Sequence, residues 1–321
     1  MGWDWLGNVR SAAIATALLS NATFAACDVK TPKQIRAGLH ALENTALHFL
    51  TTTNLDGIGI AIAQGGRLLF SKNYGDGVTN PIFQAASIGK VVSAFGAMKL
   101  VERGKLTLDE PLSKFVSAPY LPPGPFADKV TLRTVLNHTS GMTNDPDGVD
   151  RSIAFEPGTQ YSYSGAGFHY MQTAVEDTTG RDFNSYMVGE LKKLGMKNSH
   201  FELEDAGAVY VGAAYSLMTT PEELLHFFDE LGSPDPANAW VAEKMTLPTW
   251  QFDPDESVGL GPRLSFCGAE VSIHHTGCNF SRHRGIAIHF KKSRTTVVVL
   301  ARGKDSYGVP SRLAELAVGG F

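Results

Sequence analysis

The sequence predicts an α+β fold in which one antiparallel sheet is assembled from both ends of the chain. Apolar, strand-like segments gather at 57–74 and again at 258–300, and helical periodicity dominates the stretch between them. The helix that begins at Ser87 is apolar on nearly every face, which places it in the interior. The predicted regions are a sheet region at 27–80 plus 250–321, flanked by terminal helices, and an inserted all-helical region at 81–249. We expect the active site in the cleft between them.

Residues 1–26 resemble a secretory signal peptide. An uncharged run of small and apolar residues follows Arg10 and ends in Thr-Phe-Ala-Ala-Cys, a small-residue cleavage pattern. The stretch ending at Cys27 also matches a loose lipobox, but Phe24 is a poor first residue for that motif, so a lipid anchor is the less favoured alternative. No later stretch reaches the ~18 apolar residues that a membrane span needs. We therefore predict an exported protein, periplasmic or secreted.

The other elements are predicted from hydrophobic periodicity and from turn residues. Helices are expected where apolar residues recur three or four positions apart, at 31–52, 87–104, 131–138, 168–178, 182–194, 220–231, 237–245 and 311–318. Strands are expected where apolar residues alternate or run together between turns, at 57–63, 67–74, 258–266, 271–277, 285–290 and 295–300.

Composition describes an ordinary globular protein and argues against a nucleic-acid partner. The 321 residues are 43% hydrophobic, the net charge is −4, and no run of Lys or Arg occurs. Three cysteines make no disulfide framework. Cys278 is expected to lie roughly 23 Å along a strand from the turn that holds Cys267. A disulfide needs Cα atoms within about 7 Å, so we expect no bond between these two cysteines.

The buried helix begins with a hydroxyl beside an ammonium. Ser87 and Lys90 are three residues apart and therefore neighbours on one helical face. The unpaired N–H groups and positive dipole end of a helix N-terminus suit a developing oxyanion. Ser-x-x-Lys alone is weak, because roughly one match is expected by chance in a chain of this composition. A capping serine next to a solvated lysine explains the pair equally well until other motifs are considered.

Three further motifs follow in order along the chain: Leu136-Asn-His-Thr-Ser-Gly-Met142, Pro157-Gly-Thr-Gln-Tyr-Ser-Tyr163-Ser-Gly, and His275-Thr-Gly277. Together with Ser87-Ile-Gly-Lys90 they resemble the class C β-lactamase and penicillin-binding-protein-like family of serine hydrolases. This β-lactamase-related family includes D-alanyl-D-alanine carboxypeptidases, D-aminopeptidases and family VIII-type esterases. The resemblance runs from about Gly57 to the C-terminus and implies the β-lactamase/transpeptidase-like fold.

The resemblance also implies acyl transfer through an acyl-enzyme, with no cofactor. Ser87 is the expected nucleophile, and a free hydroxyl needs a base. Lys90, with a pKa lowered by burial, and Tyr163, which relays a proton, are both candidates, and the sequence leaves open which is the general base. The backbone N–H groups of Ser87 and Cys278 are the expected oxyanion hole. Asn137-His138-Thr139 is expected to hold the loop beneath the site.

The implied substrate-binding positions are Gly165, His275, Thr276 and Gly277. Two of them depart from the family pattern, because Gly165 stands where Asn is common and His275 stands where lactamases have Lys. In the family, that Asn meets the amide of the substrate and that Lys attracts its carboxylate. These departures favour ester substrates among small-molecule or peptide-like acyl compounds, with β-lactamase or D-alanyl and D-amino-acid peptidase activity as the alternative.

Two other interpretations are less favoured. A catalytically silent relative that binds peptidoglycan-like ligands conflicts with the intact Ser87, Lys90 and Tyr163. A metal site among His274, His275 and the nearby His283 and His289 is not expected. His274 and His275 point to opposite faces of a strand, and no carboxylate shares their spacing.

Overall fold

The structure, a computed structural model, describes residues 28–145, 148–202, 211–279 and 282–319. The predicted signal peptide at 1–26 and the alternative lipid anchor at Cys27 lie outside these residues. Across the described ranges, no helix combines the length and the hydropathy needed to cross a membrane.

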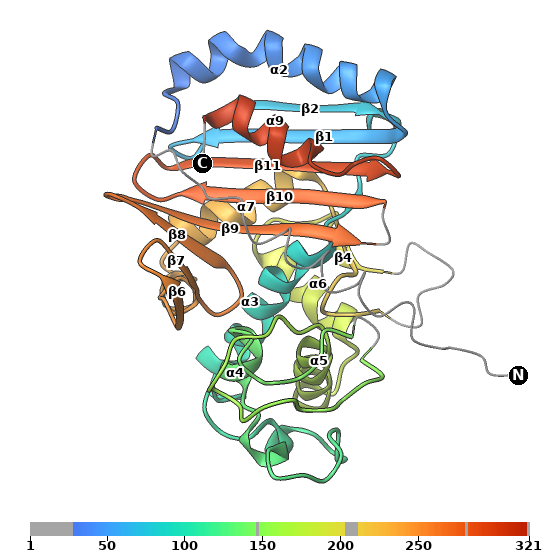
Figure 1. The fold of residues 1–321 in the computed structure, drawn as a ribbon, viewed down its shortest axis with the longest axis vertical. Coiled ribbons are helices and arrows are strands. Elements are labelled where there is room, and N and C mark those ends of the chain that lie inside the picture. Colours follow the sequence, from blue (N-terminus) through green and yellow to red (C-terminus); the bar gives the residue numbers. More distant parts are fainter. Residues whose placement is uncertain (1–27, 146–147, 203–210, 280–281, 320–321) are drawn as a thin grey trace, which may run out of the picture.

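An eight-stranded antiparallel sheet joins the two ends of the chain (Figure 1). Its strand order is β2-β1-β11-β10-β9-β8-β7-β6, so β1 lies between its hairpin partner β2 and the last strand, β11. In chain order the strands are β1 (Leu55–Gln64), β2 (Arg67–Gly75), β6 (Trp250–Asp253), β7 (Glu256–Val258), β8 (Arg263–Cys267), β9 (Glu270–Asn279), β10 (His283–Phe290) and β11 (Thr295–Gly303). The sheet built from both termini is confirmed.

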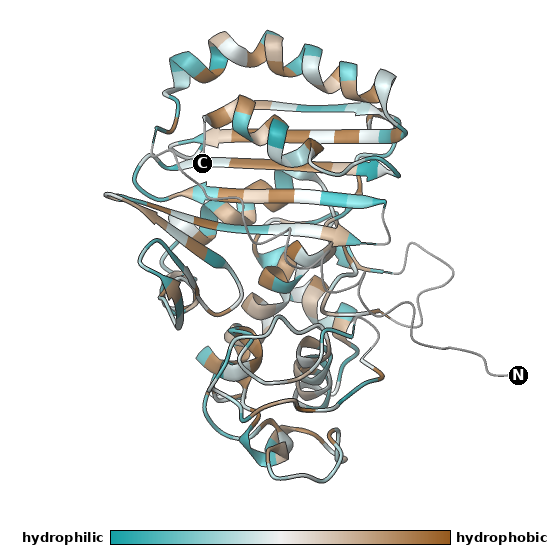
Figure 2. Ribbon diagram, viewed as in Figure 1, coloured by the Kyte–Doolittle hydropathy of each residue, from teal (hydrophilic) through white to brown (hydrophobic). Residues whose placement is uncertain are grey.

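Two terminal helices cover one face of this sheet (Figure 1). α2 (Pro32–Thr52) starts at a capping box, in which Thr31 and Gln34 exchange hydrogen bonds between side chain and backbone. Its hydrophobic and hydrophilic residues alternate along its length, which is typical of a surface helix (Figure 2). α2 and α9 (Val309–Val318) share a hydrophobic core with one side of the central strands, including Ile60.

The opposite face of the sheet packs against helices of the inserted region. α7 (Pro221–Gly232) contacts β1, β10 and β11. α3 (Gly89–Glu102) is buried from Gly89 to Leu100, as its all-round apolar sequence predicts. Ala61 and Val298 of the sheet belong to the same hydrophobic core as these helices. The sheet is therefore covered on both faces.

The inserted region is mostly helical, and its remaining helices are α4 (Leu132–Leu136), α5 (Ala166–Thr179), α6 (Phe183–Lys193) and α8 (Ala239–Met245). The prediction of an all-helical region was wrong in one respect. A small antiparallel sheet, in the order β3-β5-β4, is formed by β3 (Phe83–Gln84), β5 (Leu217–Thr219) and β4 (His200–Phe201). Strands of two or three residues are too short to show a period-two pattern in the sequence.

The predicted single strand at 258–266 was also wrong. The structure divides this stretch into β7 and β8, and the preceding β6 completes a hairpin that the sequence analysis did not find. The division falls at residues 259–262, where Gly261 has a φ of +113° and Pro262 has no N–H to donate to a strand. A tight turn results, in which the Gly259 N–H donates to the Pro262 carbonyl oxygen at 2.9 Å.

The cysteines bear out one prediction, and they also include a disulfide that the sequence did not predict. Cys278 is a free, exposed cysteine, whereas Cys267 is engaged in a disulfide. No disulfide therefore joins Cys267 and Cys278, in agreement with their expected separation along β9 and its turn.

Candidate active site

Ser87 lies on a tight turn between the small sheet and the buried helix. A single 3₁₀ turn at Ala86–Ile88 carries it, so the regular helix begins two residues later than the sequence predicts. Ala86 starts this turn with a φ of +49°, a conformation that costs a non-glycine residue roughly 1–2 kcal/mol. The turn is anchored where the Ala85 N–H donates to the Leu217 carbonyl oxygen at 2.8 Å. Strain of this kind is often concentrated at functional sites.

Lys90 reaches back from α3 to Ser87. Its Nζ donates to the Ser87 Oγ at 3.2 Å and to the Ala214 carbonyl oxygen at 2.8 Å. The side chain is 3% exposed, and burial lowers the pKa of Lys90 to about 7. Burial has this effect because the charged form loses its hydration. Near neutral pH, a large fraction of Lys90 is therefore an unprotonated amine beside the Ser87 hydroxyl.

Tyr163 lies against the other side of Lys90. The centre of its ring is 4.9 Å from the Lys90 Nζ. Burial raises the pKa of Tyr163, and the neighbouring Ser87 hydroxyl opposes that shift. The Tyr163 hydroxyl is buried and makes no hydrogen bond of regular geometry with the part of the chain that the structure describes. Ser87 and Lys90 thus come from a turn and the helix that directly follows it, and Tyr163 joins them from a loop that is distant in sequence.

His138 holds the loop that carries Tyr163. The His138 ring lies 4.3 Å from the Tyr163 ring, between centroids. The Ser164 N–H donates to the His138 Nδ1 at 3.1 Å, and the Ser162 N–H donates to the His138 carbonyl oxygen at 2.8 Å. Burial lowers the pKa of His138 strongly, and the charge of Lys90 adds to this effect. The expected supporting role of the 137–139 stretch agrees with these contacts.

Strand β9 closes the site on the side of the large sheet. A Cβ atom at Gly277 would lie 2.3 Å from the Ala85 carbonyl oxygen, so only glycine lets β9 approach the Ser87 turn this closely. Cys278 follows directly, and Thr276 is exposed. The two predicted oxyanion-hole residues, Ser87 and Cys278, therefore belong to adjacent stretches of backbone.

His275 faces the same site as a neutral ring. It is 5% exposed, and its ring lies 6.3 Å from that of Tyr163, between centroids. Burial lowers the pKa of His275 to about 3, and the charge of Lys90 adds to the shift. Its Nδ1 lies 2.6 Å from the Thr276 carbonyl oxygen. Because a carbonyl only accepts, Nδ1 carries the ring proton and Nε2 is left as a hydrogen-bond acceptor.

Gly165 lies at the start of α5, two residues beyond Tyr163. Its N–H donates to the Asn144 Oδ1 at 3.0 Å. A Cβ atom at this position would lie 3.0 Å from the Asp145 carbonyl oxygen. The loop at 143–145 therefore occupies the space into which a larger side chain at residue 165 would extend.

Phe252 and Arg263 also lie near the site, although the sequence did not predict them. Phe252 comes from the unrecognised strand β6, and its ring packs edge-to-face on Tyr161 at 4.6 Å between centroids. The Arg263 guanidinium carbon lies 5.2 Å from the centre of the Phe252 ring. The positions of both residues depend on the turns that connect β6, β7 and β8, and no short sequence motif identifies those turns.

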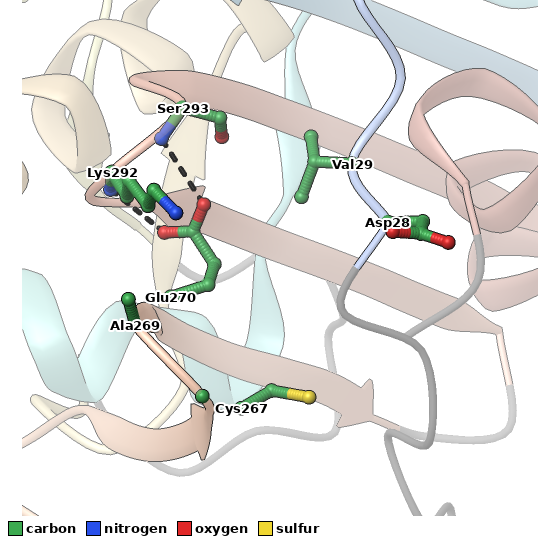
Figure 3. Close-up of a pocket in the computed structure, with 8 residues that line it drawn as sticks. Asp28, Val29, Cys267, Ala269, Glu270, Lys292 and Ser293 are labelled. Carbon is green, nitrogen blue, oxygen red and sulfur yellow. Dashed lines mark hydrogen bonds between the residues drawn. The ribbon is translucent and has the colours of Figure 1, made fainter.

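In the described part of the chain, the candidate active site holds no recognisable metal centre, and a separate pocket lies elsewhere on the surface. Within the described residues, no group of three or more His, Cys, Asp or Glu side chains is arranged to hold a metal ion. A surface pocket lies at the turn between β8 and β9, at the opposite end of β9 from Gly277 (Figure 3). There the Glu270 carboxylate accepts the backbone N–H groups of Lys292 and Ser293, at 2.7 and 3.1 Å (Figure 3). This pocket is separate from the candidate active site.

The large antiparallel sheet and its helical layer define the β-lactamase-fold class of serine hydrolases. The chain belongs to the β-lactamase family, whose family model matches residues 42–318.

Individual relatives agree with this assignment. The chain is 29% identical over 186 residues to penicillin-binding protein 4 of Amycolatopsis lactamdurans, covering 50% of this chain and 44% of that protein. It spans between 36% and 44% of the length of the first curated relatives that it matches. The octameric penicillin-binding protein homologue from Pyrococcus abyssi has a similar fold, with a TM-score of 0.71, 23% identity, and coverage of 87% of this chain and 76% of that one. EstCE1, a hydrolase with promiscuous acyltransferase activity, also has a similar fold, with a TM-score of 0.72 and 15% identity. The match covers 89% of this chain and 99% of EstCE1.

Proposed function

We propose that this protein is a periplasmic or secreted serine hydrolase that acts through an acyl-enzyme and favours ester substrates. The observation that carries the proposal is the 3.2 Å contact between the Ser87 Oγ and the Nζ of a buried Lys90. Burial, which lowers the pKa of Lys90 to about 7, turns an ordinary ammonium into a base near neutral pH. This arrangement supplies both a nucleophile and the group that activates it.

The proposed reaction has two steps, the acylation of Ser87 and the hydrolysis of the acyl-enzyme, and Lys90 and Tyr163 transfer protons in it. The Ser87 Oγ bonds to the acyl carbon while its proton passes to Lys90, and the backbone N–H groups of Ser87 and Cys278 stabilise the oxyanion. The bond to the leaving group then breaks, and that group receives the proton through Tyr163. Water then attacks the acyl carbon while Lys90 takes its proton, the bond between the acyl carbon and the Ser87 Oγ breaks, and the acid leaves as Lys90 returns a proton to Ser87. We assign Lys90 as the base and Tyr163 as the proton donor because burial lowers the pKa of Lys90 and raises that of Tyr163.

The pH dependence of kcat/KM tests the assignment of the base. Lys90 acts only after losing its proton, so kcat/KM is expected to rise with pH and to level off above a midpoint of about 7. An unperturbed lysine, with a pKa of about 10.4, would place this midpoint more than three pH units higher. A profile measured from pH 5 to 9 with a neutral aryl ester distinguishes the two. Activity that is flat from pH 5 to 8 contradicts Lys90 as the base.

Ester substrates are favoured over β-lactams because an amide partner is missing. The acylamino group of a β-lactam needs a hydrogen-bond partner, and Gly165 has no side chain to provide one. An unpaired buried amide costs roughly 1–3 kcal/mol, which corresponds to a loss of about fivefold to about 150-fold in rate. The neutral His275 provides no cation for a carboxylate at β9. β-Lactams and D-amino-acid amides remain the second substrate class, since a class C β-lactamase and a D-stereospecific amidohydrolase from Streptomyces share the fold.

We expect the wild-type protein to hydrolyse a short-chain aryl ester with a kcat/KM at least about tenfold above that for a cephalosporin. Intact-mass analysis after incubation with a fluorophosphonate, the ester and a penicillin is expected to show a covalent adduct that Ser87→Ala lacks. A cephalosporin hydrolysed as efficiently as the ester would contradict the substrate preference. An absence of both turnover and adduct would favour a binding protein over an enzyme.

A further inference from the structure

Phe252 projects from an irregular strand at the edge of the large sheet. It lies on β6, the last strand in the sheet order (Figure 1). The register of β6 with β7 shifts between Gln251 and Asp253, so Phe252, which lies at the shift, is the extra residue on β6. A β-bulge bends its strand and redirects a side chain, and bulges are frequent beside active sites. The irregular pairing therefore determines where the Phe252 ring points.

A continuous row of ring contacts connects Phe252 to the proposed base. Phe252 packs edge-to-face on Tyr161, with 4.6 Å between the ring centroids. The Tyr161 ring lies 6.0 Å from the His138 ring, and the His138 ring lies 4.3 Å from that of Tyr163, again between centroids. The centre of the Tyr163 ring is 4.9 Å from the Lys90 Nζ. Phe252 is thus the outer end of a row of aromatic rings whose inner end is the candidate active site.

The Phe252 ring is held in one orientation but remains open to a ligand. Tyr161 contacts it edge-to-face, and the Arg263 guanidinium carbon lies 5.2 Å from the centre of the ring. Contacts of both kinds stabilise a particular ring orientation. Phe252 is nevertheless 36% exposed, whereas Lys90 at the other end of the row is 3% exposed. Because its neighbours already orient the exposed ring, it can bind an apolar group with little further loss of conformational entropy.

We propose that Phe252 binds an aromatic group of the substrate, so that the preferred esters carry an aromatic ring at a distance from the ester bond. This inference rests on the proposed function and names the substrate class for the same site. An aromatic group packed on Phe252 gains the favourable geometry of a ring pair in addition to the burial of its apolar surface. Tyr161 and Arg263 are positioning residues, because they hold the Phe252 ring. The reacting bond lies at Ser87, beyond the inner end of the row.

The test compares pairs of aryl esters that share the reacting bond and differ by one ring. One pair places the extra ring in the leaving group, as 2-naphthyl acetate and phenyl acetate, whose leaving groups have similar acidity. The other places it at the end of the acyl chain, as phenyl 4-phenylbutanoate and phenyl butanoate. In the wild type, we expect kcat/KM for the larger member of at least one pair to exceed that of the smaller about fivefold or more. Phe252→Ala is expected to reduce this ratio towards one, and Phe252→Trp to keep it.

Two controls separate recognition from folding and from catalysis. Leu68→Ala removes an exposed apolar side chain from β2, the strand at the other edge of the sheet, and is expected to leave both ratios unchanged. Calorimetry of the corresponding amides with the Ser87→Ala protein, with and without Phe252→Ala, repeats the comparison without turnover.

The possible outcomes distinguish this inference from the proposed function. A wild type that hydrolyses both members of each pair equally well overturns the role of Phe252 and leaves the serine hydrolase intact, as does a Phe252→Ala protein that keeps the preference. If no ester is hydrolysed, the proposed function fails and calorimetry decides the role of Phe252. Tighter binding of the larger amide that Phe252→Ala abolishes then supports it, and equal binding of the two amides overturns it.

Discussion

Replacing Ser87 with alanine is expected to abolish ester hydrolysis while leaving the fold intact. The substitution removes the hydroxyl oxygen, the proposed nucleophile, that lies 3.2 Å from the Lys90 Nζ. Removal of a catalytic serine in a serine protease costs about 10⁶-fold in kcat, so we expect a loss of at least about 10³-fold here. Steady-state hydrolysis of a short aryl ester, measured with protein free of wild-type contamination, gives this value directly.

The fold is expected to survive because Ser87 does not cap the helix. Neither the 3₁₀ turn nor α3 has a side-chain cap, so alanine removes no capping hydrogen bond. The stability of α3 comes from its buried residues, and the change in the free energy of unfolding is expected to stay within about 1 kcal/mol. Thermal unfolding of the purified variant checks this.

Ser93 provides the matched control on the same helix. Its hydroxyl is buried and donates to the Ala213 carbonyl oxygen at 2.8 Å rather than to a group of the proposed catalytic site. Ser93→Ala is therefore expected to lower stability by about 1 kcal/mol while turnover persists. If Ser87→Ala retains near-wild-type hydrolysis, or if Ser93→Ala loses as much activity, Ser87 is not the nucleophile.

The fold was predictable where the chain repeats a simple pattern. The all-round apolar sequence of α3 and the apolar strands β1 and β11 are buried as expected, because hydrophobic burial dominates in long segments. The errors fall on short elements. β3, β4 and β5 hold two or three residues each, and the β6–β8 turns depend on the conformation of Gly261 and on Pro262. Such elements are decided by tertiary contacts rather than by local periodicity.

The candidate site also combines features that the sequence predicts with features that depend on tertiary contacts. The closeness of Ser87 and Lys90 follows from a three-residue spacing, which the helical geometry fixes. The left-handed backbone conformation of Ala86 could not be predicted, because alanine rarely adopts it and nothing in the sequence indicates it. Arg263 also could not be predicted, since it comes near Tyr161 only through its contact with Phe252 of β6. Residues that meet through strand pairing are separated in sequence, so spacing alone does not reveal them.

Lys90→Ala and Tyr163→Phe are each expected to lower kcat by at least about 10²-fold, which is the lower range for general acid–base catalysis. The double variant is expected to be little worse than the poorer single variant. Lys90 contacts the Ser87 hydroxyl, and the ring of Tyr163 lies 4.9 Å from the Lys90 Nζ, so in the proposed relay the two groups handle the same proton. Residues that act as one unit give non-additive losses. The measurement is a double-mutant cycle on kcat with one aryl ester.

Lys99→Ala tests whether the loss reflects chemistry or packing. Lys99 is also buried on α3, but its Nζ donates to the Ala237 carbonyl oxygen at 3.1 Å and pairs with Glu102, away from Ser87. Its removal is expected to lower stability and to leave the pH midpoint of kcat/KM near 7. Tyr163→Phe keeps the ring against His138 and removes only the hydroxyl, so its loss of activity is expected without a matching loss of stability. Losses that multiply in the double variant would show that Lys90 and Tyr163 work independently, and the proton relay through Tyr163 would then be wrong.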